Sequence, residues 1–383
     1  MALACGAAVG NLYLCQPLLP VIARDFGVAV GAVGMVPAAT QLGYAAGILL
    51  LVPLIDSVAP ARLVRWLLGL SSGGLFLAAL APGLTSLAAA GLLVGVFTVT
   101  AQVLISMSPS LSDPRGRGRA VGTLVSGLIL GILLSRAGSG AVAQLAGTWR
   151  AAYVTAGALT LGLMVVLPGF LPTLPGRGEA LRYRALMSSL PGLLRHQPLR
   201  QSMGINFFGY AAFSAIWADL APHLASPPFL LGPAAIGLFG LFGAPGAILA
   251  PLAGRLADRW GSNRVNLAGL TSISAALLLA GSLGRHSSLA IIAALNFLDF
   301  GQQCGQVANQ ARIFRAHESA SGRLNTLYMA ASFSGGALGS LFGSLIMGRG
   351  GWPYVCVFGL VLVCCAAAVL ARGALLGRRL DQG

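Results

Sequence analysis

Long apolar stretches alternate with short polar segments along the whole chain. Most of these stretches reach about 20 residues, which is the length that an α-helix needs to cross the hydrocarbon core of a bilayer. The pattern predicts an all-α integral membrane protein. We expect twelve transmembrane helices, at residues 3–22, 30–53, 62–81, 84–107, 119–145, 150–171, 201–222, 231–254, 264–284, 287–311, 324–348 and 351–373.

The longest polar interval divides these spans into two sets of six. It covers residues 172–200 and is rich in proline and arginine. We predict that it is a cytoplasmic loop between an N-terminal six-helix half, residues 1–171, and a C-terminal six-helix half, residues 201–383.

A short motif follows the second span of each half. It reads IDSVAPARL in the first half and ADRWGSNRV in the second. In both copies an arginine follows an aspartate by six residues, as Asp56 with Arg62 and as Asp258 with Arg264. Two six-helix halves arranged as a parallel repeat are a known design of transporters.

The basic residues predict the orientation of the chain. All 24 of them are arginine, and the net charge is +15. With both termini in the cytoplasm, 19 arginines fall in cytoplasmic loops and the tail, four fall outside, and Arg136 lies within a span. This asymmetry is the positive-inside pattern, so the charge indicates anionic lipid headgroups at the cytoplasmic face and no nucleic-acid partner.

The tenth predicted span carries a polar stripe within the sequence LNFLDFGQQCGQVANQ, residues 295–310. Its polar side chains follow a 3-4-3-4 spacing, which places them on one helix face. At about 1.5 Å per residue from Ser287, Asp299 lies roughly 18 Å into a core about 30 Å thick. An acid at that depth suits reversible proton binding, and the alternative is a neutral, hydrogen-bonded aspartate that fixes the helix. The stripe consists of Asn296, Asp299, Gln303, Gln306 and Gln310.

The segment GRLADRWGSNR, residues 254–264, resembles the signature of the major facilitator superfamily. The stretches NLYLCQPLLPVIARDFG, GRAVGTLVSGLILGILLSR and GRLNTLYMAASFSGGALGS resemble the bacterial sugar-efflux and drug-efflux permeases, which are drug:proton antiporter-like. The resemblance implies that spans 1, 4, 7 and 10 line a central cavity and that spans 3, 6, 9 and 12 face lipid. Spans 2, 5, 8 and 11 would join the halves. It also implies a cytoplasmic lock at Asp56, Arg62, Gly254, Asp258, Arg259, Gly261 and Arg264.

Polar and aromatic residues recur on all four spans that the resemblance assigns to the cavity. Together they favour a site for a small uncharged or amphipathic organic molecule, although any one of them could instead bond one helix to another. The cavity candidates are Asn11, Tyr13, Gln16, Gln102, Asn206, Tyr210, Trp217, Asn296, Gln303 and Gln306.

Two charged residues lie near the expected outer ends of their spans. Arg136 can snorkel while holding a structural partner, pair with an acid, or bind an anionic group of the substrate. Asp219 lies roughly 27 Å into span 7, where we expect it to be solvated. Because their depths match, we predict that the two form part of an outer gate.

Glycines recur at helical spacing in spans 5, 8 and 11, where they allow close helix approach. We expect them at the sliding contacts between the halves. They are Gly127, Gly131, Gly237, Gly240, Gly243, Gly246, Gly335, Gly339 and Gly343.

These features favour a secondary active transporter of the bacterial inner membrane, exporting a small organic solute by alternating access. We expect a monomer driven by the proton gradient, with no cofactor or metal and a role in multidrug resistance. An importer or facilitator with the same fold remains the alternative, because span 4 lacks an arginine and span 5 lacks the glycine-proline pair of antiporters. A phosphate-loop lysine is absent, and the histidines and cysteines form no catalytic or metal spacing, which disfavours an ATP-driven pump or an enzyme.

Overall fold

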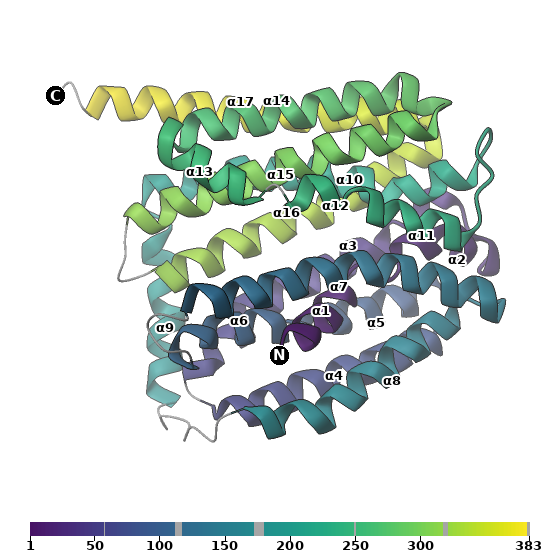
Figure 1. Cartoon of the computed structure of the whole chain (residues 1–383), viewed down its shortest axis with the longest axis horizontal. Helices are drawn as coiled ribbons and strands as arrows, with labels where there is room; N and C mark the ends of the chain where they lie inside the picture. The colour runs from purple at the N-terminus through teal and green to yellow at the C-terminus, as the bar shows by residue number, and fades with distance from the viewer. Residues whose placement is uncertain (57, 112–116, 172–179, 249, 317–320, 381–383) are drawn as a thin grey trace. The chain divides into compact units, whose positions relative to one another are not determined.

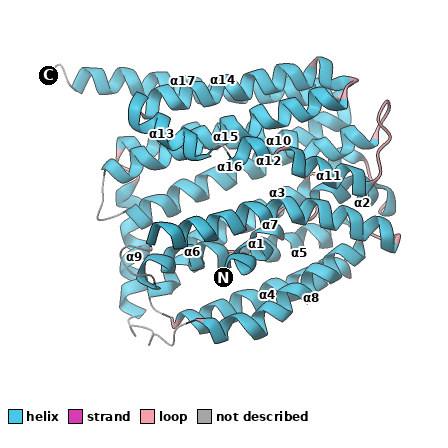
Figure 2. Ribbon diagram, viewed as in Figure 1, coloured by secondary structure: helices cyan, strands magenta, loops and turns pink. Residues whose placement is uncertain are grey.

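The computed structural model describes the chain except for residues 57, 112–116, 172–179, 249, 317–320 and 381–383. Within the described residues every regular secondary-structure element is an α-helix or a 3₁₀ helix, and Figure 2 shows no strand. The all-α fold class is therefore confirmed. Figure 1 labels the helices in chain order.

The first half of the chain begins with a broken helix. The helix α1, Ala2–Gly10, is followed by turns, by the 3₁₀ helix η1, Gln16–Leu18, and by α2, Leu19–Asp25. Proline stands at the start of both later segments, where its missing N–H and fixed φ prevent one continuous helix. The remaining helices of this half are η2 Val30–Ala32, α3 Met35–Leu51, η3 Val52–Asp56, α4 Pro60–Ala79, α5 Leu84–Phe97, α6 Thr100–Leu111, α7 Arg117–Ala146, α8 Arg150–Val166 and η4 Leu167–Phe170.

The second half contains a break in its second span, predicted as a continuous helix at residues 231–254. The break lies at Gly243, between α11, Pro233–Phe242, and α12, Ala244–Ile248; the helix α13 covers Ala250–Trp260. Gly243 and Pro245, which lacks a backbone N–H, account for the break at this point. The remaining helices are α9 Ala180–Leu193, which lies in the predicted loop, α10 Gln197–Ala225, α14 Ser262–Gly281, η5 Leu283–Arg285, α15 Ser288–Ala316, α16 Ser321–Gly350 and α17 Trp352–Leu380.

Length and composition alone do not confirm all twelve spans. Three predicted spans form the unbroken helices α4, α10 and α15, but their polar residues make them less apolar than a membrane-crossing helix is expected to be. The two broken spans, 1 and 8, contain no helix that is long enough to cross. The helical segments of the described chain that are long and apolar enough to cross a membrane are seven: Val30–Ile55, Leu84–Met107, Gly122–Ala146, Arg150–Phe170, Ser262–Gly281, Gly322–Gly350 and Trp352–Leu375.

The chain divides into two compact units. The first contains residues 1–28, 35–189 and 231–241, and the second contains residues 29–34, 190–230 and 242–383. In the first unit α1 packs on α7, α3 on α5, and α4 on α8; in the second, α10 packs on α16, α14 on α15, and α14 on α17. The pairing of spans 1 with 5 and 3 with 6 thus recurs as 7 with 11 and 9 with 12, as expected for a repeat.

Large apolar side chains remain exposed on the four helices that we expected to face lipid. Trp66 of α4 and Val165 of α8 are exposed in the first unit, and Leu278 of α14 and Tyr354 of α17 are exposed in the second. A soluble domain rarely leaves so many large apolar groups on its surface, so these faces suit the hydrocarbon core of a bilayer.

The glycines of spans 5 and 11 pack closely within each half. Gly131 of α7 lies against the backbone of Gly6 in α1, and Gly339 of α16 lies against the backbone of Ala211 in α10. These glycines serve the contact between the first and fifth spans of a half, and a sliding contact between the halves stays a prediction. Gly237 and Gly240 of α11 do contact α7, at Arg136, within the first unit.

Candidate functional site

The break in span 8 is held by the polar stripe of α15. The Asn296 side-chain amide donates to Phe242 O at 2.8 Å, and its Oδ1 accepts from Gly246 N at 3.2 Å. These are backbone groups that an uninterrupted helix would have bonded to itself. Asn296 was predicted as a cavity residue, and the structure gives it this supporting role between α11 and α12.

Asp299 and Trp217 meet at Gly243, the residue between α11 and α12. A Cβ built on Gly243 would collide with Oδ2 of Asp299 and would lie 3.5 Å from Cζ2 of Trp217. Asp299 is half-buried, whereas Trp217 is buried. The structure therefore brings two of the predicted site residues, from spans 7 and 10, to one point of the second unit.

Aromatic side chains extend from this point along α10. Trp217 lies next to Phe213, with ring centroids 6.2 Å apart, and Phe213 stacks on Tyr210 at 5.4 Å. Phe333 of α16 packs edge-on against Tyr210 at 5.2 Å. An aromatic row beside a carboxyl group can bind the flat or cationic parts of an organic molecule.

The other residues of the stripe divide into two groups. Gln303 and Gln306 are half-buried on the face of α15 that carries Asp299. Gln310 instead donates to Asn325 of α16 at 3.2 Å and so connects two helices. Of the predicted cavity residues on α15, Gln303 and Gln306 remain suited to a ligand.

Asn206 belongs to a cross-link that the sequence analysis missed. Its amide donates to Ser332 Oγ at 2.6 Å, and its Oδ1 accepts from Gln302 at 3.2 Å, so α10, α15 and α16 are bonded together. A second missed pair joins Asn266 and Asn309, which exchange hydrogen bonds of 3.2 and 3.0 Å. The only sequence signal for either pair was an amide within an apolar helix.

The cavity candidates of the first unit also have partners inside that unit. Asn11 donates to Thr160 Oγ1 of α8 at 3.2 Å, and Gln102 of α6 donates to Tyr44 Oη of α3 at 3.2 Å. Asn11 is buried and Gln102 is partly buried. These bonds join helices, which was the alternative to a substrate role.

Arg136 is buried against the broken first span. Its Nε donates to Gln16 Oε1 at 2.8 Å, and its guanidinium lies 5.1 Å from the centre of the Tyr13 ring. The structure thus favours the alternative in which Arg136 holds structural partners. These partners, Gln16 and Tyr13, were both predicted as cavity residues.

The expectation that Asp219 is solvated was wrong. Its exposed fraction is 0%, and its Oδ1 accepts a hydrogen bond of 2.7 Å from Ser344 of α16. The helical rise gives only a depth, whereas close packing of α16 on this face of α10 excludes water. The gate between Arg136 and Asp219 stays a prediction.

The second copy of the repeated motif has a defined turn. Gly261 adopts φ +80° between α13 and α14, a conformation that favours glycine. Ala59, at the matching place in the first copy, adopts φ −55°, so the two turns differ. The side chain of Asp56 lies outside the described residues.

Asp258 of the second copy forms an ion pair with Arg315 at the end of α15, with 2.9 Å between Oδ1 and the guanidinium nitrogen. Both side chains are exposed, so the pair adds at most about 1 kcal/mol to stability. Arg62, Arg259 and Arg264 are exposed as well, and Gly254 lies near Val307 of α15.

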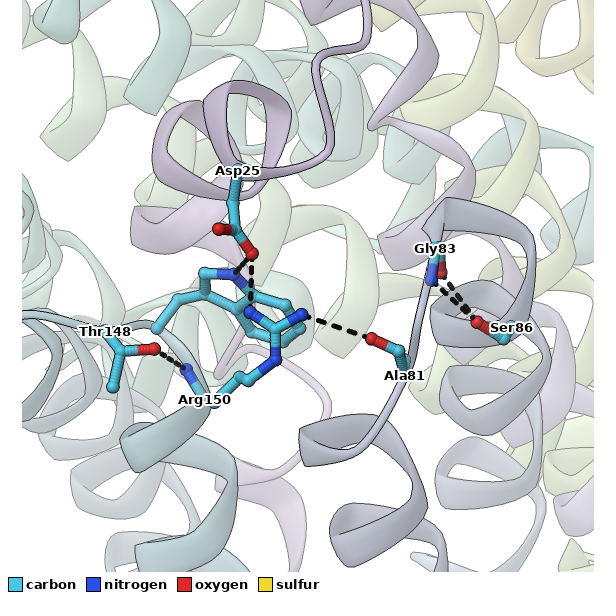
Figure 3. Close-up of polar contacts among 7 residues, drawn as sticks. Asp25, Ala81, Gly83, Ser86, Thr148 and Arg150 are labelled. Atoms are coloured by element: carbon cyan, nitrogen blue, oxygen red, sulfur yellow. Dashed lines mark hydrogen bonds and ion pairs between the residues drawn. The ribbon is translucent and has the colours of Figure 1, made fainter.

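A separate cluster ties the end of α2 to the start of α8 (Figure 3). Oδ2 of Asp25 accepts from Trp149 Nε1 at 2.9 Å and from Arg150, which also donates to Ala81 O at 3.3 Å. The Trp149 and Arg150 hydrogen bonds hold the pKa of Asp25 below its ordinary value. The cluster is a structural clamp.

The described residues contain no group of three or more His, Cys, Asp or Glu side chains that could bind a metal ion. The cysteines described are free.

The chain is similar over most of its length to a transporter family and to proteins named as putative or probable transporters. A model of the Major Facilitator Superfamily matches it twice, at residues 1–203 and 202–380. It is 37% identical over 374 residues to the putative uncharacterized transporter YgaY of Escherichia coli (strain K12), covering 97% of this chain and 94% of that protein. It is 35% identical over 360 residues to the probable transporter SCO4007 of Streptomyces coelicolor, covering 93% and 82%.

Among solved structures, a bacterial homologue of the human lysosomal transporter Spinster matches with a TM-score of 0.75 at 14% identity. The match covers 98% of this chain and 95% of that one. At this identity the likeness shows the fold alone.

Proposed function

Since the chain belongs to the major facilitator superfamily, we propose that it is a proton-coupled exporter. Membership of this family makes it a multi-pass membrane transporter and not an enzyme. The cargo is a small organic molecule, drug-like, sugar-like or a natural product, and alternating access moves it outward. We place the protein in the inner membrane as a monomer with both termini in the cytoplasm, energised by the proton gradient without a cofactor.

The observation that carries this proposal is the carboxyl group of Asp299 beside Trp217 and Gly243. Asp299 stands 11 residues into α15, about 17 Å along a helix whose ends would reach the two membrane surfaces. Burying an acid at membrane depth costs free energy, so acids are rare there and usually mark a functional site. Proton relays are one such site. Its half-buried position suits a group that exchanges protons with water during part of a transport cycle.

Side chains on α10 and α15 support the proposed cargo class. Tyr210 and Trp217 provide aromatic faces, while Gln303 and Gln306 provide amides on the same side of α15 as Asp299. Aromatic faces bind apolar and cationic groups, and amides bind hydroxyl or carbonyl groups. This combination suits an uncharged or amphipathic organic solute.

The test is substrate-dependent proton flux in liposomes that contain the full chain. An imposed pH gradient is combined with a panel of sugars, antibiotics and amphipathic cations, and internal pH is followed for wild type and Asp299→Asn. We expect at least one compound to drive proton flux in wild type, and we expect this flux to be lost in Asp299→Asn. Asp25→Asn is the matched acid-to-amide control and should retain the flux, because Asp25 belongs to the clamp between α2 and α8.

Two outcomes contradict the proposal. A compound that crosses equally well without a gradient, and equally well in Asp299→Asn, identifies a facilitator in which Asp299 is structural. Accumulation of labelled compound on the side that represents the cytoplasm identifies an importer. Right-side-out and inside-out vesicles, separated by protease access to the central loop, distinguish the two directions.

A further inference from the structure

Asp219 of α10 is a buried carboxyl group that the proposed coupling site does not use. Its Oδ1 accepts from Ser344 Oγ at 2.7 Å, while its Oδ2 is buried and has no hydrogen-bond partner among the described residues. An ionised carboxylate removed from water costs several kcal/mol unless it is paired and fully hydrogen-bonded. These surroundings therefore fit a neutral carboxyl group that carries a proton.

The two ionisable residues nearest in sequence to Asp219 and Ser344, His223 and Arg349, have other surroundings. His223, one turn further along α10, lies with Nε2 3.1 Å from Gly284 O and stacks on Trp352 at 4.4 Å. Arg349 of α16 is exposed. Within the described part of the chain, Asp219 forms no ion pair. The other described titratable groups on the helices packed against α10 are Asp299, Cys304, Arg312 and Arg315 on α15, Arg323 and Tyr328 on α16, and Tyr354, Cys356, Cys364, Cys365 and Arg372 on α17.

Residues 29–34 pack against Ser344, and they belong to the same compact unit as α10 and α16. A Cβ on Gly34 would collide with the Ser344 side chain, and a Cβ on Gly31 would lie 2.9 Å from Ser344 O. A Cβ on Gly343 would lie 2.8 Å from Oδ2 of Asp219. The carboxyl group thus lies against Gly343 and Ser344 of α16, and this segment packs on the same serine.

We propose that Asp219 is a second proton-binding site, which holds its proton while residues 29–34 pack on α16 and releases it to water when this segment leaves. Departure of the segment exposes Ser344, and water then reaches the carboxyl group. Hydration lowers the free energy of the ionised carboxylate, so the proton can leave. Because linkage is reciprocal, ionisation of Asp219 weakens the packing of the segment. The proposal deepens the proposed function and rests on it for the role of the released proton.

The contact between spans 1 and 5 of the first unit includes a different pair of polar residues. Gln16 of η1 accepts from Arg136 of α7. Spans 1 and 5 are therefore joined by an amide and a guanidinium where spans 7 and 11 are joined by an acid and a hydroxyl. This asymmetry assigns the proton to the second unit.

The first test detects the proton by infrared difference spectroscopy on the full chain in lipid nanodiscs at neutral pH. We expect the carbonyl band of a protonated carboxyl group in wild type and in Asp299→Asn, with loss of that intensity in Asp219→Asn. Ser344→Ala removes the hydrogen bond to Oδ1 and should shift the band, which keeps the test decisive if Asp219→Asn folds poorly. A band that neither Asp219→Asn nor Ser344→Ala changes overturns the proposal.

The second test measures the linkage through the accessibility of residue 33. Val33 is fully buried within the segment 29–34, so Val33→Cys reports its departure when labelled by a thiol reagent. In mildly alkaline buffer we expect labelling several-fold faster with Asp219 than with Asp219→Asn, which stays neutral. The native cysteines lie within the predicted spans, and peptide mass spectrometry separates any labelling of them from that of Val33→Cys.

Equal labelling of Val33→Cys in both backgrounds overturns the link to residues 29–34. Both tests proceed without a transported compound, so their results stand whether or not proton flux is found. Conversely, a carboxyl band assigned to Asp219 together with flux that survives Asp299→Asn would move the coupling site from α15 to α10.

Discussion

At the scale of single residues, the acids of this chain differ by their surroundings rather than by their positions in the sequence. Asp258 is exposed and pairs with Arg315, Asp25 is clamped by Trp149 and Arg150, and Asp219 has a 0% exposed fraction. The depth of each acid could be estimated from the sequence, because helical rise is regular. The enclosure of Asp219 could not, because it depends on which face of α10 meets α16.

Gly243→Ala should disable the site around Asp299. The added methyl group would collide with the Asp299 carboxyl group and touch Trp217, and overpacking of this kind costs about 1–3 kcal/mol. We expect loss of substrate-dependent proton flux per folded molecule, measured in liposomes. Gly209→Ala is the control, because a Cβ there meets nothing within 4 Å, and equal loss in both variants would contradict the packing argument.

Asp25→Asn should lower stability in a pH-dependent way. The pKa of Asp25 is depressed in the folded state, so its contribution is present above the unfolded value of about 3.9 and is lost as pH falls through the folded value. Since both partners are partly exposed, we expect a difference of up to about 1 kcal/mol near neutral pH. Thermal unfolding of wild type and variant in detergent should converge as the pH is lowered, and a constant difference would exclude the ion pair as the cause.

At the scale of helices, close approach between the first and fifth spans is a shared feature of both units. Gly127 and Gly131 admit the backbone of α1, and Gly335 and Gly339 admit the backbone of α10. The glycine spacing was visible in the sequence and correctly indicated close contacts. The partner helix could not be identified from the sequence, because the glycines show which helix face is closely packed and not which helix packs against it.

Gly131→Ala should therefore separate α1 from α7. The backbone of Gly6 leaves no room for a methyl group, and a rigid neighbour cannot yield as a side chain can. We expect destabilisation of about 1–3 kcal/mol, read from thermal unfolding in detergent. Gly138→Ala, two turns along the same helix in open space, should change stability by less than about 0.5 kcal/mol. Similar losses in the two variants would contradict the packing argument, because alanine favours a helix over glycine and propensity alone predicts no loss.

At the scale of the whole molecule, most of the fold could be predicted because hydrophobic length and the repeated motif are strong signals. The breaks in spans 1 and 8 were missed, since hydropathy does not register how Pro17 and Gly243 interrupt the backbone hydrogen bonds of a helix. The cross-link of Asn206, Gln302 and Ser332 was missed because it joins three helices. The site at Gly243 was partly anticipated, through Asp299 and Trp217.

The gate predicted from Arg136 and Asp219 belongs to this scale as well. In the structure each residue has a partner within its own unit, Gln16 and Ser344 respectively. A gating ion pair requires an ionised Asp219, so we predict that it forms after Asp219 has lost its proton. Transport rates of Arg136→Gln, Asp219→Asn and the double variant should be non-additive, and strict additivity would remove the gate.

The polar residues of α10 and α15 have a consequence for biogenesis. These helices are as long as their neighbours but fall short of them in apolar content. A segment leaves the translocon for lipid according to its own hydrophobicity, and each central acid or amide opposes that step. The apolar helices α14, α16 and α17 must then retain α10 and α15 in the membrane by packing on them. Truncation before α16 should therefore leave α10 poorly inserted, even though every residue of α10 is present.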